Sequence, residues 1–278
     1  MTIVDNMPAE EYHAMPSVSS SQLATLWKSS PAHLRYNLDH GQKDTAALSF
    51  GRAFHTLLLE PHLWNNEVAV APNVDRRTAK GKEEYAGFLE SSTGKTIIST
   101  QENGIARAMT KALRDTPSTK EILDGKGKRE CSLFWTDATT KLECRARFDW
   151  LRSDGLIVDV KTAKTAKPTI FRSEAINYGY HLRAFHYMEA YRHTFYKDPE
   201  GYVFVVVEKE APHVCAAYYA DQDFIDFGEH CWRETMGQYA ECKRTNTWKG
   251  YTEFIEPLGV PAWVTRTLEN QGEPLWAN

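Results

Sequence analysis

Three consecutive segments in which polar and apolar residues alternate occupy the middle of the chain. They read RECSLFWT from residue 129, LECRARFDWL from residue 142 and GLIVDVKT from residue 155, with turn residues at 137–140 and 153–155. A period of two is typical of strands, and short turns between strands give antiparallel neighbours. The segments therefore predict a three-stranded antiparallel meander.

Helical patterns and two more strands surround this meander. Apolar residues at helical spacing, with Ser, Pro and turn residues at the boundaries, indicate helices on both sides of a mixed sheet, which is an α/β domain. The expected helices cover about 20–27, 31–38, 49–60, 83–90, 101–114, 170–193 and 222–243, and the further strands are GYVFVVVEKE (201–210) and HVCAAYYA (213–220).

The length of 278 residues suits one large α/β domain, or a catalytic core with an N-terminal helical extension. We predict a single domain over 1–278. Within it, 1–45 would be the helical extension, 46–245 the catalytic core and 246–278 a C-terminal tail.

Composition and short motifs exclude several classes of protein. No apolar run is long enough to span a bilayer and no secretory signal is visible, so we expect a cytoplasmic protein without a membrane role. The five cysteines form no CxxC pair, which argues against a zinc site or a disulfide framework. The absence of GxxxxGK, HExxH and GxSxG motifs argues against ATP hydrolysis, metalloprotease and esterase chemistry.

Positive charge is concentrated in one part of the chain. The net charge is −4, but residues 126–172 hold eleven Lys and Arg against six Asp and Glu, which gives +5 there and −9 elsewhere. Such segregation suits a DNA-binding groove on an acidic body, although a solvated charged face has the same composition. The candidate DNA contacts in this segment are Arg145, Arg147 and Lys164.

Two aspartates of the meander are expected to face each other. If the turn is centred on Asp154, Asp149 and Asp159 lie opposite on neighbouring strands. Like charges in that position repel unless a cation lies between them. Two carboxylates, with the backbone carbonyl of Val160 as a further oxygen ligand, suit Mg²⁺. The sequence therefore predicts a magnesium site.

Lys161 follows Asp159 by two residues and points to the same face of its strand. There it could orient or deprotonate an attacking water, or neutralise the charge that builds on a phosphate. Asp-x-Lys triplets also occur on many surface strands. The opposing Asp149 makes this triplet a catalytic candidate, with Asp149, Asp159 and Lys161 as its members.

His55 and Glu130 have two interpretations each. His55 lies in the apolar 49–60 helix and is either a buried core residue or part of the metal site. An imidazole is softer than the ligands magnesium prefers, so Mn²⁺ is a candidate substitute. Glu130 opens the first strand of the meander and is either a water-mediated metal contact or an exposed strand-end acid.

Arg183 and Tyr187 lie four residues apart in the 170–193 segment and share one helical face. We predict that Arg183 contacts a DNA phosphate and that Tyr187 stacks or hydrogen-bonds nearby. The other aromatic residues of this segment, including Tyr178 and Tyr180, are predicted to pack on the sheet.

Four motifs together resemble a known nuclease family. They are GRAFH at 51–55, CRARFDWL at 144–151, IVDVKT at 157–162 and YHLRAFHY at 180–187. This combination is similar to the RecB-type branch of the PD-(D/E)XK nuclease superfamily, and more narrowly to the nuclease domains of RecE (exonuclease VIII) and its phage-encoded relatives. The stretches VSSSQLATLWKSSPAHLRY at 18–36 and SLFWTD at 132–137 extend the resemblance over nearly the whole chain. It implies a restriction-endonuclease-like fold, with a central mixed sheet flanked by helices.

The resemblance also implies an activity and a site. The activity is a Mg²⁺-dependent 5′-to-3′ exonuclease that acts on double-stranded DNA ends and leaves 3′ tails for a RecT-like annealing protein, in a bacterial cell or a phage-infected host. His55, Asp149 and Asp159 would be metal ligands, Lys161 the catalytic lysine and Glu130 an active-site acid. The family helix usually has Gln where this chain has Arg183, four residues before Tyr187.

The assembly implied by the resemblance and by the charge segregation is a ring-shaped homo-trimer or homo-tetramer around DNA. Other functions stay open at this stage, because a fold and a metal site do not determine the substrate. They are an endonuclease, a single-strand exonuclease, and a catalytically silent DNA-binding module.

Overall fold

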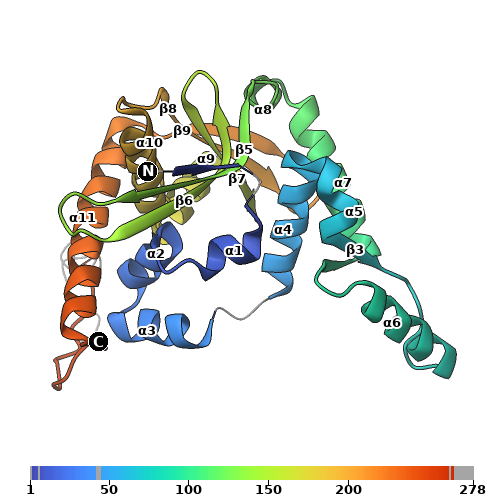
Figure 1. The fold of residues 1–278 in the computed structure, drawn as a ribbon, viewed down its shortest axis with the longest axis horizontal. Coiled ribbons are helices and arrows are strands. Elements are labelled where there is room, and N and C mark those ends of the chain that lie inside the picture. The colour runs from blue at the N-terminus through green and yellow to red at the C-terminus, as the bar shows by residue number, and fades with distance from the viewer. Residues whose placement is uncertain (1, 6, 42–44, 263, 266–278) are drawn as a thin grey trace, which may run out of the picture.

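A mixed β-sheet forms the centre of the molecule (Figure 1). The structure, a computed structural model, describes residues 2–5, 7–41, 45–262 and 264–265. The strand order is β1-β5-β6-β7-β8-β9, and β2 pairs with β6. Neighbours are antiparallel except β7 with β8 and β2 with β6. The strands are β1 Thr2–Val4, β2 Val18–Ser19, β5 Gly127–Thr136, β6 Glu143–Arg152, β7 Leu156–Ala163, β8 Gly201–Glu208 and β9 Cys215–Tyr219.

The predicted meander is confirmed, together with its register. β5, β6 and β7 are consecutive antiparallel neighbours, and Trp150 pairs with Val158 while Leu151 pairs with Ile157. This register places the turn at Asp154, as the sequence predicts. β8 then pairs along all eight residues of β7, and seven of its eight residues are buried. A strand buried on both faces explains the nearly unbroken apolar run in its sequence.

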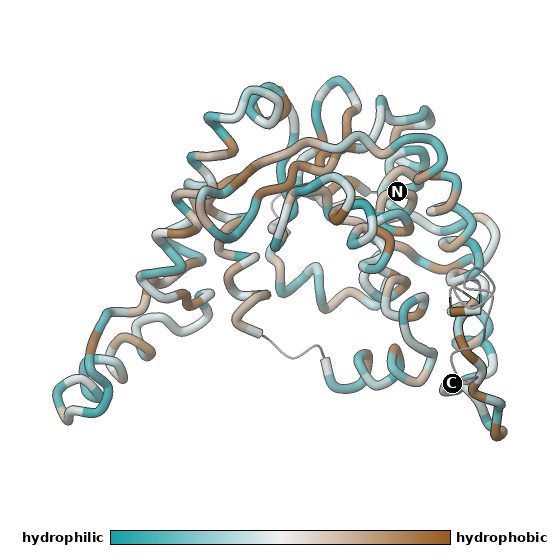
Figure 2. The backbone as a smooth tube through the Cα atoms, turned by 180° about the vertical axis from the view of Figure 1, so that it is seen from behind, coloured by the Kyte–Doolittle hydropathy of each residue, from teal (hydrophilic) through white to brown (hydrophobic). Residues whose placement is uncertain are grey.

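Helices cover both faces of the sheet, which confirms the predicted α/β class. One face packs against a large core with α10, α2 and α11, and the other against a second core with α4 and α7. Figure 2 shows the apolar stretches concentrated along the sheet. The helices on the first face are α2 Ser20–Lys28, α9 Pro168–Asn177, α10 Tyr180–Phe195 and α11 Gln222–Thr245, and those on the second are α4 Ala46–Leu59, α7 Thr100–Asp115 and α8 Pro117–Leu123.

Helix starts follow the capping signals of the sequence. Ser19 accepts a hydrogen bond from the backbone of Gln22, whose side chain accepts one in return from the backbone of Ser19. Ser30 caps α3 (Pro31–His40), where proline occupies the first turn. These side chains satisfy backbone N–H groups that have no partner within the helix.

The prediction of one helix over 170–193 is wrong. The segment forms two helices, α9 and α10, because Gly179 adopts a left-handed conformation with φ of +71° between them. Glycine adopts this conformation without the steric cost of a Cβ atom. The break leaves Tyr178 at a corner between two helices instead of on a continuous helical face.

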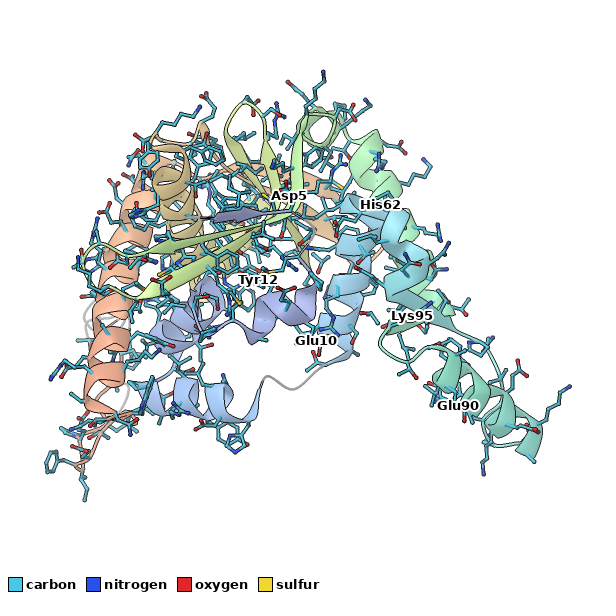
Figure 3. The ribbon with its side chains drawn as sticks, in the orientation of Figure 1. Asp5, Glu10, Tyr12, His62, Glu90 and Lys95 are labelled. Atoms are coloured by element: carbon cyan, nitrogen blue, oxygen red, sulfur yellow. The ribbon has the colours of Figure 1, made fainter. Side chains whose placement is uncertain are left out.

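Several short elements were not predicted. Residues 9–14 form α1 (Ala9–Ala14), which lies beneath the sheet and carries Glu10 and Tyr12 (Figure 3).

Helix α6 (Ala79–Ser91) starts about four residues before the predicted helix. It connects the parallel strands β3 (Val68–Ala71) and β4 (Thr96–Ser99) and extends away from the sheet (Figure 1). The remaining short elements are η1 Pro61–Leu63 and α5 Trp64–Glu67.

Every helix within the described residues is too short or too polar to cross a membrane. The proposed boundaries at residues 45 and 245 remain predictions. Of the predicted tail at 246–278, residue 263 and residues 266–278 lie outside the described residues.

The contact between α10 and α11 depends on a glycine. A Cβ atom at Gly228 would lie 2.3 Å from the carbonyl oxygen of His181, whereas one at Gly237 on the same helix would meet nothing within 4 Å. We expect Gly228→Ala to destabilise the fold by about 1–3 kcal/mol, because the two helices must move apart. Gly237→Ala is the matched control and should stabilise by roughly 0.5–1 kcal/mol through helix propensity. Urea unfolding measures both, and equal effects would contradict the close packing.

Candidate functional site

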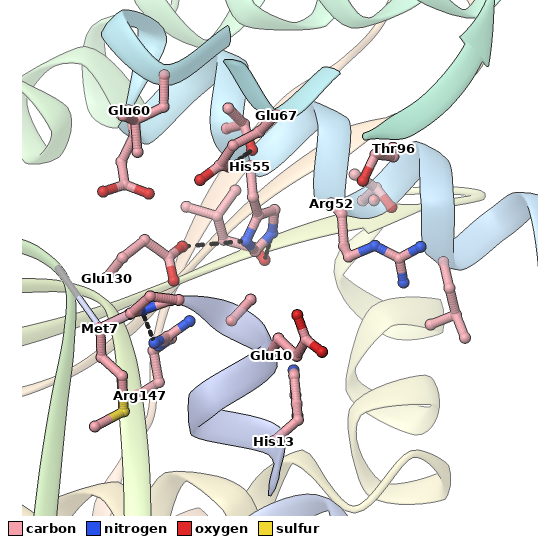
Figure 4. Close-up of a pocket in the computed structure, with 18 of the residues that line it drawn as sticks. Met7, Glu10, His13, Arg52, His55, Glu60, Glu67, Thr96, Glu130 and Arg147 are labelled. Carbon is pink, nitrogen blue, oxygen red and sulfur yellow. Dashed lines mark hydrogen bonds and ion pairs between the residues drawn. The ribbon is translucent and has the colours of Figure 1, made fainter. Parts of the chain in front are cut away.

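A cleft of about 1160 Å³ opens between α4, α1 and the start of α10 (Figure 4). Side chains from α4 and from the meander meet in it. Figure 4 shows His55 directed toward Glu130, with Arg147 bound to the backbone of Met7. The cleft therefore brings together residues that lie far apart in the sequence.

The β6–β7 strand pairing stops at the position where the two aspartates would pair. The last paired residues are Trp150 and Val158, and in this register Asp149 is opposite Asp159. Beyond this point, side chains replace the strand partner of Val160. Asp149 Oδ2 accepts a hydrogen bond from Val160 N at 2.7 Å, and His55 Nε2 donates one to Val160 O at 3.2 Å. The backbone of one β7 residue thus orients two candidate ligands.

Glu130 lies opposite Asp149 on the other side of β6. The residues before and after Glu130 in β5 pair with Trp150 and Phe148 of β6. Glu130 is therefore opposite Asp149, although the regular backbone pairing of the two strands is interrupted at this position. Glu130 has φ of +47°, a conformation that costs free energy for a residue with a side chain. Phe148 and Trp150 pack into different cores although they are two residues apart, so the alternation of faces shifts by one here. This local distortion aligns three carboxylates across β5, β6 and β7.

Three side chains could hold a metal ion together. Ligand atoms of His55, Glu130 and Asp149 lie within 4.8 Å of one another. His55 Nδ1 is 3.9 Å from Glu130 and 3.8 Å from Asp149. Because Nε2 donates its hydrogen to Val160 O, Nδ1 is the ring nitrogen whose lone pair can bind a metal ion. Many metal-binding histidines are oriented in this way, with the nitrogen that does not bind the metal donating a hydrogen bond to the protein. One imidazole and two carboxylates fit a divalent cation.

Two parts of the predicted ligand set have other positions in this arrangement. Val160 was predicted as a carbonyl ligand, but its carbonyl accepts the hydrogen bond from His55. Asp159 was predicted as a ligand, but it binds Lys161 Nζ and accepts a hydrogen bond from Tyr202 Oη at 2.9 Å. The cluster of three contains Glu130, and Asp159 lies directly beside it, in hydrogen-bond contact with Asp149. Asp159 and Lys161 share one face of β7, so the lysine is the positive charge nearest to Asp159, and the role of Asp159 as a metal ligand stays a prediction.

Lys161 lies between the aspartates and the cleft. Its side chain is 18% exposed and lines the cleft, and its Nζ is 5.3 Å from the centre of the Tyr180 ring. Burial opposes its charge, but Asp159 and Asp149 together raise the pKa of Lys161 above its usual value. The lysine is therefore a permanent cation that can meet a phosphate oxygen.

The pKa values of the site's carboxyl groups shift in different directions in the absence of a cation. Burial raises the pKa of Asp149 from 3.8 to about 6. Burial and the nearby Asp149 raise the pKa of Glu130 as well. Burial acts in the same direction on Asp159, but the charge of Lys161 outweighs it and lowers the pKa of Asp159. Asp159 therefore stays ionised. A bound metal ion would stabilise the ionised forms of Asp149 and Glu130, which burial disfavours.

The structure corrects the prediction that Arg145 contacts DNA. Arg145 is 4% exposed, and its guanidinium donates to the backbone carbonyls of Met15 and His13 at the end of α1. Arg147 donates to Met7 O and stacks over Tyr12, but it also lines the cleft. Both arginines thus hold α1 against β6, and only Arg147 lies at the cleft surface.

Tyr187 also differs from its predicted role. Its ring packs against Phe148 at 5.2 Å and Tyr202 at 6.3 Å between ring centres, and it is not part of the cleft lining. It supports Tyr202, which in turn holds Asp159. Arg183 lines the cleft, and its contact with a DNA phosphate stays a prediction, whereas Lys164 lines a smaller neighbouring cavity of about 340 Å³.

The concentration of charge in residues 126–172 does not by itself form the groove. Of its eleven basic residues, Arg147 and Lys161 line the cleft. Others are paired elsewhere, such as Arg152 with Asp154 and Lys128 with Asp5. The other Lys and Arg side chains that line the cleft belong to other elements, namely Lys28 of α2, Arg52 of α4 and Arg183 of α10.

Sequence reasoning missed part of the cleft lining. Lys28 was not singled out, and the prediction that Tyr178 packs on the sheet is wrong, because its side chain is 48% exposed. Both residues lie at helix ends, and only the packing of α2 beside α10 brings them together. Glu60 and Glu67 were also missed, and they line the side of the cleft next to Glu130. The GRAFH segment was a signal for Arg52, which lies one turn before His55.

Comparisons with known proteins agree with this architecture. Residues 19–258 match a family described as a PDDEXK-like domain of unknown function (DUF3799). A solved protein from Eubacterium rectale, provisionally assigned as an exonuclease, superposes with a TM-score of 0.64 at 10% identity over 94% of this chain and 98% of its own. A second, SSO0001, reaches a TM-score of only 0.35 at 9% identity over 82% of this chain and 81% of its own. No curated protein matches the chain.

The raised pKa of Asp149 predicts how the metal-free protein responds to pH. Below about pH 4 the carboxyl is protonated in the folded and unfolded states, and the shift has no effect on stability. Above pH 6 it is ionised in both, and the folded state bears the full cost of burying the charge. The contribution of Asp149 to stability should therefore fall as pH rises from 4 to 6. Asp149→Asn keeps an acceptor for Val160 N and should be more stable than the unmodified protein at pH 7, by at most about 3 kcal/mol, and similar at pH 4.

Asp154→Asn serves as a control of opposite sign. A hydrogen bond from Arg152 lowers the pKa of Asp154, so this substitution should cost stability at pH 7 and nothing at acid pH. Chemical unfolding in EDTA across this pH range measures both, and added Mg²⁺ or Mn²⁺ should reverse the loss in the unmodified protein. A pH-independent effect of Asp149→Asn would contradict the buried charge.

Proposed function

The chain belongs to the family of PDDEXK-like domains, and on this premise we propose that it is a metal-dependent nuclease that hydrolyses phosphodiester bonds of DNA. The observation that carries the proposal is the meeting of His55, Glu130 and Asp149 with Lys161 in one cleft. The restriction-endonuclease-like fold places these groups at the point where the strands of the meander separate. A catalytically silent DNA-binding module would not account for this grouping of partly buried carboxylates with a histidine and a lysine.

The residues divide the chemistry between them. His55, Glu130 and Asp149 would hold the cation, which polarises a phosphate oxygen and lowers the pKa of a water molecule when it is bound. Lys161 faces the same cleft and stabilises negative charge on the phosphate in the transition state. Asp159 and Tyr202 keep the lysine in place, because Asp159 binds Lys161 and Tyr202 binds Asp159. Mg²⁺ is the proposed cofactor, and the imidazole of His55 makes Mn²⁺ a suitable substitute.

The proposed substrate is linear double-stranded DNA, cut from an end. The exonuclease assignment of the Eubacterium rectale protein supports an end-directed activity, since the two chains share a fold over nearly their whole lengths. The motifs quoted above support the finer proposals. These are 5′-to-3′ polarity, 3′ single-stranded tails that a RecT-like annealing protein receives, and action in the cytoplasm of a bacterial cell or phage-infected host.

Digestion of matched DNA forms tests the activity. With Mg²⁺, we expect linear duplex DNA to be degraded while covalently closed circles of the same sequence survive. Lys161→Met should lower the rate by a factor on the order of 10³, because it removes charge stabilisation from the transition state, yet it should still bind the metal. The measurement is the release of end-labelled nucleotides on a sequencing gel, with a 5′ or a 3′ label to give the polarity.

The same experiment separates the competing functions. Rapid linearisation of closed circles would indicate an endonuclease, and preferential loss of single-stranded DNA would indicate a single-strand exonuclease. Binding of DNA without cleavage in either metal would contradict a nuclease.

We also propose that the active form is a ring-shaped homo-trimer or homo-tetramer. The basic cleft residues lie on an otherwise acidic molecule, and a ring would place them around a central DNA passage. Light scattering should then give three or four times the 31.7 kDa chain mass. Digestion in progress should continue after competitor DNA is added, because an enclosed duplex cannot exchange quickly. A fully active monomer would contradict the ring.

A further inference from the structure

We propose that Tyr178 is a stacking platform for a DNA base next to the scissile phosphate, in a single-strand subsite that it forms with Lys28, Tyr180 and Arg183. The inference rests on the proposed nuclease function and adds a residue that selects for unpaired DNA. It implies that the enzyme binds the end of a strand after the terminal bases have separated.

The position of Tyr178 is the first observation. It occupies the corner between α9 and α10, created by the left-handed Gly179, and its side chain is 48% exposed. It lines both the main cleft and the smaller neighbouring cavity, and Thr162 and Tyr180 also line both. A half-exposed tyrosine is ordinary on a protein surface. Here it lies where two cavities meet beside Lys161.

The surroundings of the ring are the second observation. Lys28 Nζ lies 5.2 Å from the centre of the Tyr178 ring, and the ring of Tyr180 is 5.7 Å away. Tyr180 is itself fixed, because it stacks on Phe204 at 5.7 Å and faces Lys161. Tyr178 is thus the outer member of a row that leads from the cleft entrance to the catalytic lysine. Aromatic rings next to basic side chains are the usual platform for single-stranded nucleic acid.

Arg183 provides the third observation. Its Nε is buried and has no hydrogen-bond partner among the described residues, although the side chain lines the cleft. A buried donor without a partner costs free energy, and the part of the Arg183 side chain that lines the cleft can bind a phosphate oxygen. Lys28, Lys161 and Arg183 make this wall of the cleft basic.

Acidic side chains limit where the backbone of a bound strand can lie. Glu60, Glu67 and Glu130 lie near one another in the cleft, and their charges repel phosphates. Apart from the phosphate next to the metal site, the backbone of a bound strand is therefore expected to lie beside basic side chains of the cleft, and those next to Tyr178 are Lys28 and Arg183. A base inside the duplex has both faces covered by its neighbours, so a base that stacks on Tyr178 must come from the end of the duplex, and we propose that it does so after its pair has separated.

Substrates that lack one base test the proposal. Duplexes with a single abasic site at each of the first four positions of the degraded strand would be digested in single-turnover experiments. For the unmodified protein, we expect one abasic position to lower kcat/KM by about 10-fold, the size of a typical base–aromatic contact. Tyr178→Ala should lower kcat/KM on intact DNA by a similar factor and show no further loss at that position.

Three further variants isolate the aromatic ring. Tyr178→Phe keeps the ring and should behave as the unmodified protein, whereas Tyr178→Leu keeps apolar bulk and should behave as Tyr178→Ala. Tyr219→Ala removes a tyrosine that is 64% exposed on the edge strand β9. It should leave kcat/KM unchanged both on intact DNA and on the duplexes with an abasic site. Lys28→Met should weaken DNA binding by the same factor whichever position is abasic, and DNA binding by this variant should depend less on salt concentration.

Fluorescence of 2-aminopurine, placed at the sensitive position in a Lys161→Met background with Mg²⁺, reports stacking without cleavage. Quenching that Tyr178→Ala abolishes supports the platform. Retention of the full abasic penalty in Tyr178→Ala, with normal circular dichroism, overturns it while leaving the nuclease function intact. Absence of both DNA binding and cleavage in the unmodified protein overturns the two proposals together.

Discussion

The separation of two strands at Val160 is the feature on which the site depends. A regular hairpin would satisfy the backbone of this residue with the neighbouring strand, but here Asp149 and His55 do so. Each side chain is thereby oriented by a backbone hydrogen bond and still presents another atom to the cleft. Because a buried backbone group must find a partner, the opening of the sheet and the ordering of the two ligands are one event.

The charges of the site are balanced unequally around this opening. Lys161 and Tyr202 keep Asp159 ionised, whereas burial raises the pKa of Asp149 to about 6. The repulsion between the adjacent carboxylates is thus reduced at Asp159 by the charge of Lys161. At Asp149 and Glu130 a bound cation would reduce it. The cluster with metal-binding geometry contains Glu130, Asp149 and His55, and Asp159 lies beside it with Lys161 as its partner.

Positive charge serves two separate purposes in this molecule. Arg145 and Arg147 hold α1 through backbone carbonyls and the Tyr12 ring. Helix α1 in turn contributes Glu10 and His13 to the cleft lining. The basic residues that can meet a phosphate come from several elements, such as Lys28 of α2 and Arg183 of α10. Net charge along the sequence therefore indicated a polyanion partner without identifying the residues that face it.

The sequence by itself determined the elements and the register of the meander. Periodicity, capping residues and a turn at Asp154 are local properties, so the opposition of Asp149 and Asp159 followed from them. Tertiary structure alone decided that the alternation shifts at Glu130, that Gly179 divides a helix and that Lys28 meets Tyr178. A distorted backbone and a contact between distant helices arise from packing between whole elements, and neither leaves a period in the sequence.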